Sequence, residues 1–224
     1  MSNKIKAVLF DMDGVLLDSM PYHEKAWCQL FRDEGVPFSR EEAYLNEGRT
    51  GYNTIETIIV KATGNKPSRL KVEQLYERKK ELMKQFPPVR EIEGMPKVIE
   101  YLNEIGIKIG VVTGSSQDGV INKLKHFYNK IVIKESVITG LDVKNGKPHP
   151  EPYLKALSRV GVSAEETIVI ENAPLGIESS VAANIETIAI NTGPLDNSIL
   201  YQFGAQDVCQ SSEELLQVLK ARLS

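Results

Sequence analysis

The chain has 224 residues, of which 42% are apolar and 25% charged, and its length suits an α/β core that carries an inserted subdomain. Its formal net charge of −3 gives no reason to expect a nucleic acid or an anionic membrane as a partner. We expect a cytoplasmic protein, because the two cysteines lack metal or disulfide spacing and the sequence shows neither a signal-peptide pattern nor a membrane-spanning apolar run. We also expect it to be a monomer.

The first predicted element is a buried strand over Lys6–Phe10, and it ends abruptly in two acids, Asp11 and Asp13, followed by Gly14. Two carboxylates at one spot repel each other and are costly to desolvate, so they indicate a site that binds a cation. Oxygen ligands suit a hard divalent cation such as magnesium (Mg2+), usually together with a phosphate. The alternative is that Asp13-Gly14 is only a turn after an edge strand.

The segment 19–88 is predicted to be almost wholly helical. Ser39 followed by Glu42 is the pattern of a capping box, and Pro87-Pro88 ends the last helix and indicates a hinge. The predicted helices cover 22–31, a segment that starts at Ser39, 54–62 and 68–86.

After Pro88 the pattern changes to helices that alternate with apolar strands, which predicts a parallel sheet with right-handed crossovers. The strand over Lys6–Phe10 belongs to the same sheet, so the helical segment is an insertion. We therefore predict a three-layer, Rossmann-like α/β core over 1–18 and 89–224, with a helical cap over 19–88. The expected strands are 107–112, 167–170 and 185–190, and the expected helices are 95–105, one that ends near Gly161, and 175–183.

Polar residues follow three further strands or loops at the same edge of the predicted sheet. Thr113-Gly114-Ser115 offers a hydroxyl and backbone N–H groups that suit a phosphate oxygen. Lys147 precedes a proline, and Glu171-Asn172 ends a buried strand. Each of these signals is weak alone, since such turns and solvated lysines are common. Together with Asp11 they lie where open α/β sheets bind ligands, beyond the carboxyl ends of the strands.

These residues resemble the haloacid dehalogenase superfamily of phosphotransferases, whose four motifs match Asp11-Met12-Asp13, Thr113, Lys147 and Glu171-Asn172 in order. The resemblance covers essentially the whole chain, including a C1-type helical cap, and it is closest to the β-phosphoglucomutase-like branch. It implies a small phosphorylated substrate and magnesium as the cofactor.

The resemblance also implies a role for each motif residue. Asp11 is the nucleophile that becomes an aspartyl phosphate, and Asp13 is the general acid and base, whose backbone carbonyl also contacts the metal. Thr113 and Lys147 hold the transferring phosphoryl group, with Gly114 and Ser115 beside them. Magnesium on Asp11 and Glu171 screens the charge, and Asn172 stands in the place where relatives commonly carry an aspartate.

Residues of the predicted cap are expected to decide the substrate. His23 and Lys79 fall where the mutases use a histidine gate and a substrate-side lysine, the alternative being a surface histidine and one cation on a charged helix. Mutases carry an arginine two places beyond their equivalent of Arg49, and this chain has Gly51 there. A sugar phosphate would lose that bidentate clamp, which counts against a hexose phosphomutase.

Glu47 offers a replacement for the charge that Asn172 removes. If the cap closes, Glu47 reaches the magnesium, whereas the alternative is a solvated loop carboxylate. The Glu47, Arg49 and Asn172 pattern resembles that of an inorganic pyrophosphatase within this branch. We therefore predict a phosphohydrolase acting on pyrophosphate, with a β-phosphoglucomutase or sugar-phosphate phosphatase as the alternative. A catalytically idle phosphate sensor is a third hypothesis, although a mere binder gains nothing from two repelling acids.

Overall fold

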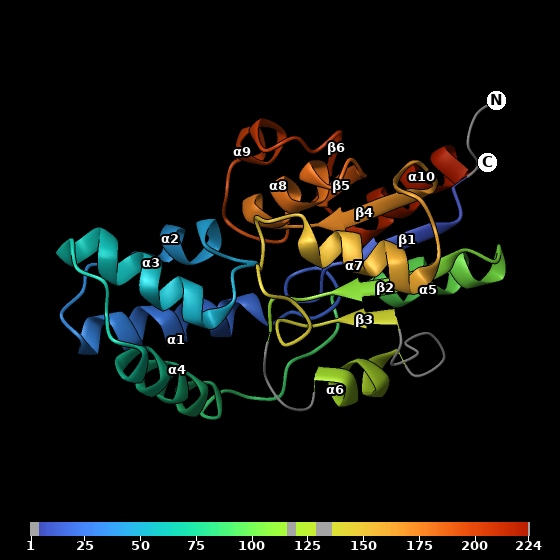
Figure 1. Ribbon diagram of the computed structural model, residues 1–224. Coiled ribbons are helices and arrows are strands. Elements are labelled where there is room, and N and C mark those ends of the chain that lie inside the picture. The colour runs from blue at the N-terminus through green and yellow to red at the C-terminus, as the bar shows by residue number, and fades with distance from the viewer. Residues whose placement is uncertain (1–4, 116–119, 129–135, 224) are drawn as a thin grey trace.

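A computed structural model describes residues 5–115, 120–128 and 136–223 and shows a parallel sheet between two layers of helices (Figure 1). Six strands form the sheet in this part of the chain, in the order β3-β2-β1-β4-β5-β6, and every neighbouring pair is parallel. The predicted Rossmann-like α/β architecture is confirmed. The strands are β1 (Ala7–Phe10), β2 (Lys108–Val112), β3 (Val137–Ile138), β4 (Thr167–Glu171), β5 (Glu186–Ile190) and β6 (Asp207–Cys209).

β1 lies at the centre of the sheet because all four of its residues are apolar and fully buried. Val8 and Phe10 pack on one face while Leu9 packs on the other, as the two-residue period of a strand requires. One face is covered by α5 (Met95–Glu104), α6 (Val120–Phe127) and α10 (Ser212–Leu223), and the other by α7 (Glu151–Val160), α8 (Pro174–Ala182) and α9 (Asn197–Gln202).

Four helices between β1 and α5 lie beyond the carboxyl ends of the strands (Figure 1). They are α1 (Met20–Asp33), α2 (Arg40–Leu45), α3 (Gly51–Thr63) and α4 (Arg69–Met83). The inner faces of α1, α3 and α4 share an apolar cluster that includes Trp27, Phe31, Ile55 and Leu75, whereas Tyr44 of α2 packs with Met20 and Leu195. We propose that they form the cap predicted for 19–88, with 1–18 and 89–224 as the core.

Local signals placed most element ends correctly. Ser39 caps α2 with the predicted box: its hydroxyl accepts from the Glu42 N–H, and its own N–H donates to the Glu42 carboxylate. α4, however, ends at Met83, before the predicted Phe86, because Lys84 already adopts the C-cap position ahead of the two prolines. β3 and β6 were not expected, since two and three residues are too few for a period to show.

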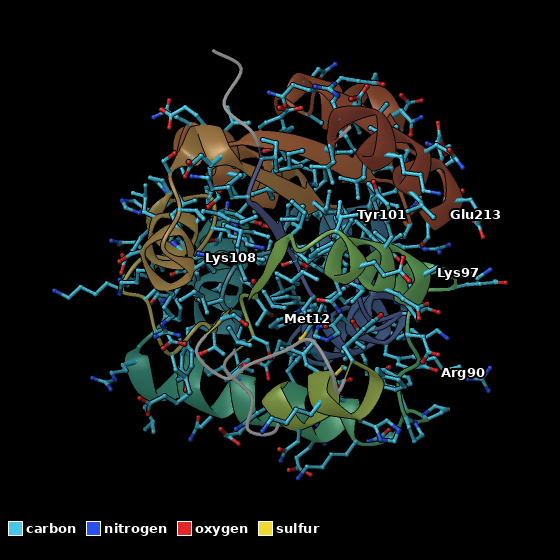
Figure 2. All side chains as sticks on the ribbon, turned by 90° about the vertical axis from the view of Figure 1, so that its right-hand side faces the viewer. Met12, Arg90, Lys97, Tyr101, Lys108 and Glu213 are labelled. Carbon is cyan, nitrogen blue, oxygen red and sulfur yellow. The ribbon has the colours of Figure 1, made fainter. Side chains whose placement is uncertain are left out.

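The amino ends of the strands form the opposite end of the molecule (Figure 2). Lys108 at the start of β2 is exposed there. The acids at this end include Glu166, Glu186 and Asp207, and they form ion pairs with Lys6 or Arg222. Met12, between the two acids of the first motif, is buried in the core (Figure 2). Because Met12 turns inward, the side chains of Asp11 and Asp13 are left to face the carboxyl edge and the cap.

Candidate active site

Asp11 is the first residue after β1, and its N–H still donates to the Ile170 carbonyl at 2.9 Å, so the central sheet fixes its backbone. Asp11 is 4% exposed. The chain then turns at Gly14, which has φ +84°, and a Cβ there would lie 2.0 Å from Asn172 Nδ2. The first motif therefore needs a glycine to pass beside the fourth motif.

Lys147 links the first motif to the fourth. Its Nζ donates to Asp11 Oδ1 and to Glu171 Oε1, both at 2.5 Å, and to the Val112 carbonyl at 3.1 Å. Burial disfavours the ammonium, but the charges of Asp11 and Glu171 outweigh that effect and raise the pKa of Lys147. Lys147 is thus a charged, buried and fully hydrogen-bonded cation beside the predicted nucleophile.

Glu171, at the end of β4, is fully buried and has partners on both carboxylate oxygens. Oε1 accepts from Lys147 and from the Tyr153 hydroxyl at 2.6 Å, and Oε2 accepts from the N–H groups of Asn172 at 3.1 Å and Ala173 at 3.3 Å. A Cβ on Gly176 would lie 2.0 Å from Oε1, so α8 passes close by. Glu171 therefore holds Lys147 in this structure, and its role as a metal ligand stays a prediction.

Asp13 faces residues from the start of the cap and from β2. The Ser19 hydroxyl donates to Asp13 Oδ1 at 2.6 Å, and the Thr113 hydroxyl donates to Oδ2 at 3.5 Å. Thr113 also accepts from the Ser115 N–H at 3.0 Å, which closes the predicted phosphate-binding turn with Gly114 between them. Sequence patterns did not indicate Ser19, because a serine before a helix normally caps that helix, and Ser19 makes no such cap bond.

His23 and Lys79 bring the cap to Asp13. His23 Nε2 lies 3.7 Å from Asp13 Oδ1, and Lys79 Nζ lies 3.0 Å from His23 Nδ1 and 5.0 Å from the centre of the Trp27 ring. Lys79 is 2% exposed, so the alternative of a cation on a charged helix surface is wrong. The structure places both predicted substrate-side groups against the pocket that contains Asp11 and Asp13.

Glu47 reaches from the loop between α2 and α3 to the fourth motif. Both of its carboxylate oxygens accept from Asn172 Nδ2, at 3.1 and 3.2 Å. Desolvation is the largest cause that raises the pKa of Glu47 well above its ordinary value, and the charge of Asp11 adds to it. Glu47 is half-buried and hydrogen-bonded to the core, which argues against a freely solvated loop carboxylate. The loop lies so close to the core that a Cβ on Gly114 would be 2.5 Å from the Gly48 carbonyl oxygen.

The residues present fit a divalent cation. Asn172 Oδ1 is buried and has no hydrogen-bond partner in the described part of the chain, although its amide nitrogen is held by Glu47. An unsatisfied buried oxygen beside the acids Asp11, Asp13 and Glu47 is the donor chemistry that magnesium prefers. Within the described ranges no three His, Cys, Asp or Glu side chains already form a metal-coordinating group, so amide and backbone oxygens would complete the set.

The acids enclose a small cavity between cap and core, of about 60 Å³. Its walls include Asp11, Asp13, Glu47, Arg49 and Ser115. Known ligand pockets have volumes of about 300–1,000 Å³, so this one suits a very small ligand unless the cap moves away.

Position 51, where mutases carry their arginine clamp, lies on the wall of this cavity. A Cβ on Gly51 would lie 2.0 Å from Tyr76 Cε2, so the tyrosine ring takes the space that the side chain would need. Arg49 is half-buried, and its Nε donates to Asn46 Oδ1 at 3.3 Å. Burial lowers the pKa of Arg49, and the charge of Glu178 opposes that shift.

The carboxyl of Asp11 predicts how stability responds to pH. Burial raises its pKa to about 8, with Lys147 opposing the rise and Glu171 and Asp13 adding to it. Between pH 4 and 8 the folded protein therefore keeps a proton that the unfolded chain has lost, so this group lowers the free energy of unfolding as pH rises. We expect Asp11→Asn to remove this dependence. Without magnesium, its advantage over the wild type should grow by on the order of 4 kcal/mol from pH 5 to pH 8, since one proton is worth about 1.4 kcal/mol per pH unit. Urea unfolding of both proteins in EDTA measures the difference, and an advantage independent of pH would contradict it.

Comparisons with known proteins agree with this geometry. Residues 8–190 match the family model described as haloacid dehalogenase-like hydrolase. A phosphorylated carbohydrates phosphatase of Thermotoga maritima is 32% identical over 96% of this chain and 99% of its own length. Hexitol phosphatase A of Escherichia coli is 28% identical over 97% of this chain and 95% of its own. A solved structure from Bacteroides vulgatus, described as a candidate beta-phosphoglucomutase, is 40% identical with a TM-score of 0.94 and covers 100% of this chain and 92% of that one.

Proposed function

Because the chain belongs to the haloacid dehalogenase-like hydrolase family, we propose that it is a magnesium-dependent phosphohydrolase that forms an aspartyl phosphate on Asp11. The observation that carries the proposal is the contact of Lys147 with both Asp11 and Glu171, beside Asp13 and beneath the cap. The buried ammonium holds one Asp11 oxygen in place.

In the described residues no helix combines the length and apolarity that a bilayer crossing requires. A small phosphorylated compound remains the expected partner.

The residues account for both halves of a hydrolysis. An Asp11 carboxylate oxygen attacks the phosphorus, the bond to the leaving oxygen breaks, and Asp13 gives that oxygen a proton. Water then attacks the acyl phosphate while the Asp13 carboxylate takes a proton from that water, which releases inorganic phosphate and restores both Asp11 and the protonated Asp13. Lys147 and Thr113 hold the phosphoryl oxygens throughout. Magnesium, held by Asp11, Asp13, Asn172 and Glu47, would neutralise the negative charge of the phosphoryl group.

The covalent step is tested by stopping the reaction in acid with labelled substrate and digesting the protein. We expect the label on the peptide that contains Asp11. Label on another residue, or product formation with no labelled protein at any time, would overturn the proposed nucleophile.

The relatives support a phosphorylated sugar or sugar alcohol as the substrate. Two curated relatives that cover nearly the whole chain are named as phosphatases of such compounds. They support this class better than pyrophosphate, which none of the relatives described above is named for. A sugar phosphate larger than the cavity of about 60 Å³ would need the cap to open before it binds.

Pyrophosphate remains a second candidate on two observations. Glu47 reaches Asn172 and adds an acid to the site, which suits a substrate that brings its own cation. The cavity is small, and Tyr76 fills the place of a sugar-phosphate clamp at Gly51. The assay that separates the classes measures kcat/KM for pyrophosphate and for hexose, hexitol and glycerol phosphates. A preference above tenfold, about 1.4 kcal/mol of transition-state stabilisation, decides between them.

Glu47→Gln is expected to raise the magnesium concentration for half-maximal rate by about tenfold, because the change removes a charge beside Asn172. The matched control is Glu41→Gln, the same substitution at an exposed position of α2. Magnesium titrations of the steady-state rate measure the effect. Equal titration curves for both variants would show that Glu47 has no role at the metal.

A further inference from the structure

We propose that Tyr153, a residue of α7 outside the four motifs, is a positioning residue that sets how Lys147 is shared between Glu171 and Asp11. The inference rests on the proposed function, in which Lys147 holds the reacting phosphoryl group. The sequence does not mark Tyr153, because a tyrosine on the apolar face of a helix is normally a core residue.

Tyr153 is fully buried between α7 and the sheet, in the apolar cluster that contains Leu9 and Val112. Its hydroxyl donates to Glu171 Oε1 at 2.6 Å, the same oxygen that accepts from Lys147 at 2.5 Å. The Lys147 ammonium lies 5.2 Å from the centre of the Tyr153 ring. One side chain therefore contacts both members of the ion pair behind the nucleophile.

The donor and acceptor counts explain why this contact matters. Lys147 has three N–H bonds, and they go to Asp11, Glu171 and the Val112 carbonyl. Oε2 of Glu171 accepts from two backbone N–H groups. In the described part of the chain, the side chains that donate to Oε1 are those of Lys147 and Tyr153. Without the hydroxyl, Oε1 carries more charge and attracts the ammonium more strongly.

The expected consequence is a loss at the chemical step. When Asp11 bonds to phosphorus, the N–H group of Lys147 that now donates to Asp11 becomes available to a phosphoryl oxygen. An ammonium drawn toward Glu171 makes that hydrogen bond poorly. We expect Tyr153→Phe to lower kcat by about tenfold, which corresponds to the free energy of one hydrogen bond to a charged group. KM should change by less than about twofold.

Tyr128→Phe is the matched control. Tyr128 is also buried in the core, and its hydroxyl donates to the Leu16 carbonyl at 2.7 Å, away from Lys147 and Glu171. Each variant loses one hydrogen bond from a buried hydroxyl, so the two melting temperatures should fall by similar amounts. Only Tyr153→Phe should have a lower kcat. Equal kcat values for the two variants would overturn the positioning role.

A double-mutant cycle tests whether Tyr153 acts through Glu171. In the Glu171→Gln background, Tyr153→Phe should lower kcat by less than about twofold, because the charge that the hydroxyl moderates is gone. Additive losses would overturn the inference.

A wild-type protein without activity on any phosphate of the panel would overturn the proposed function and this inference with it. An active wild type with an unaffected Tyr153→Phe variant overturns the inference alone.

Discussion

Asp11→Asn should lower turnover of every substrate by about 10⁴-fold or more, because an amide cannot form the acyl phosphate on which both half-reactions depend. The variant should still fold. The asparagine carbonyl can accept from Lys147 as Oδ1 does now, and one of several mutually repelling buried acids is removed. Steady-state rates with magnesium, on pyrophosphate and on the sugar phosphates, measure the loss.

The matched control for this experiment is Asp18→Asn, the same change at an exposed position seven residues along the chain. It should keep the wild-type rate. Turnover by Asp11→Asn within about tenfold of wild type would exclude Asp11 as the nucleophile. A wild type that binds phosphate but never turns over would leave the phosphate-sensor hypothesis standing instead.

Lys147→Met should destabilise the protein by about 3–5 kcal/mol, the cost of removing one partner from a buried ion pair. The change leaves the buried acidic groups of Asp11 and Glu171 without the cation that lies 2.5 Å from each. Turnover should be lost as well, since no other group in the proposed mechanism replaces the ammonium. Urea unfolding at pH 7 in EDTA measures the stability and excludes any contribution from magnesium.

Lys155→Met provides the control for stability. Lys155 is exposed and forms an ion pair with Glu151 at 2.9 Å, so its loss should cost less than about 1 kcal/mol. The double variant Lys147→Met/Asp11→Asn should recover part of the lost stability, because only one buried acidic group then lacks its cation. Equal stabilities for Lys147→Met and Lys155→Met would show that the ammonium does not stabilise the buried acids.

The sequence alone determined the core of the fold and most of the predicted catalytic residues. An apolar run that stops at Asp11 indicates a buried strand ending at a site, and alternating strands and helices bring the carboxyl ends of parallel strands to one edge. Lys147 and Glu171 were weak signals singly, and their agreement with the other polar strand ends and the family resemblance placed them there. The Ser39 capping box was readable because all its partners lie within four residues.

Tertiary structure decided what no local pattern carries. Glu47 and Asn172 are 125 positions apart, and their contact depends on how the cap lies on the core. The Tyr153 hydroxyl meets Glu171 because α7 packs across the sheet at one particular angle, and periodicity shows only that its ring is buried. Periodicity reports which face of an element avoids water, whereas a hydrogen bond depends on positions within a few tenths of an ångström. The relative placement of packed elements sets those positions. For this reason the sequence alone could not predict the size of the cavity, on which the choice of substrate depends.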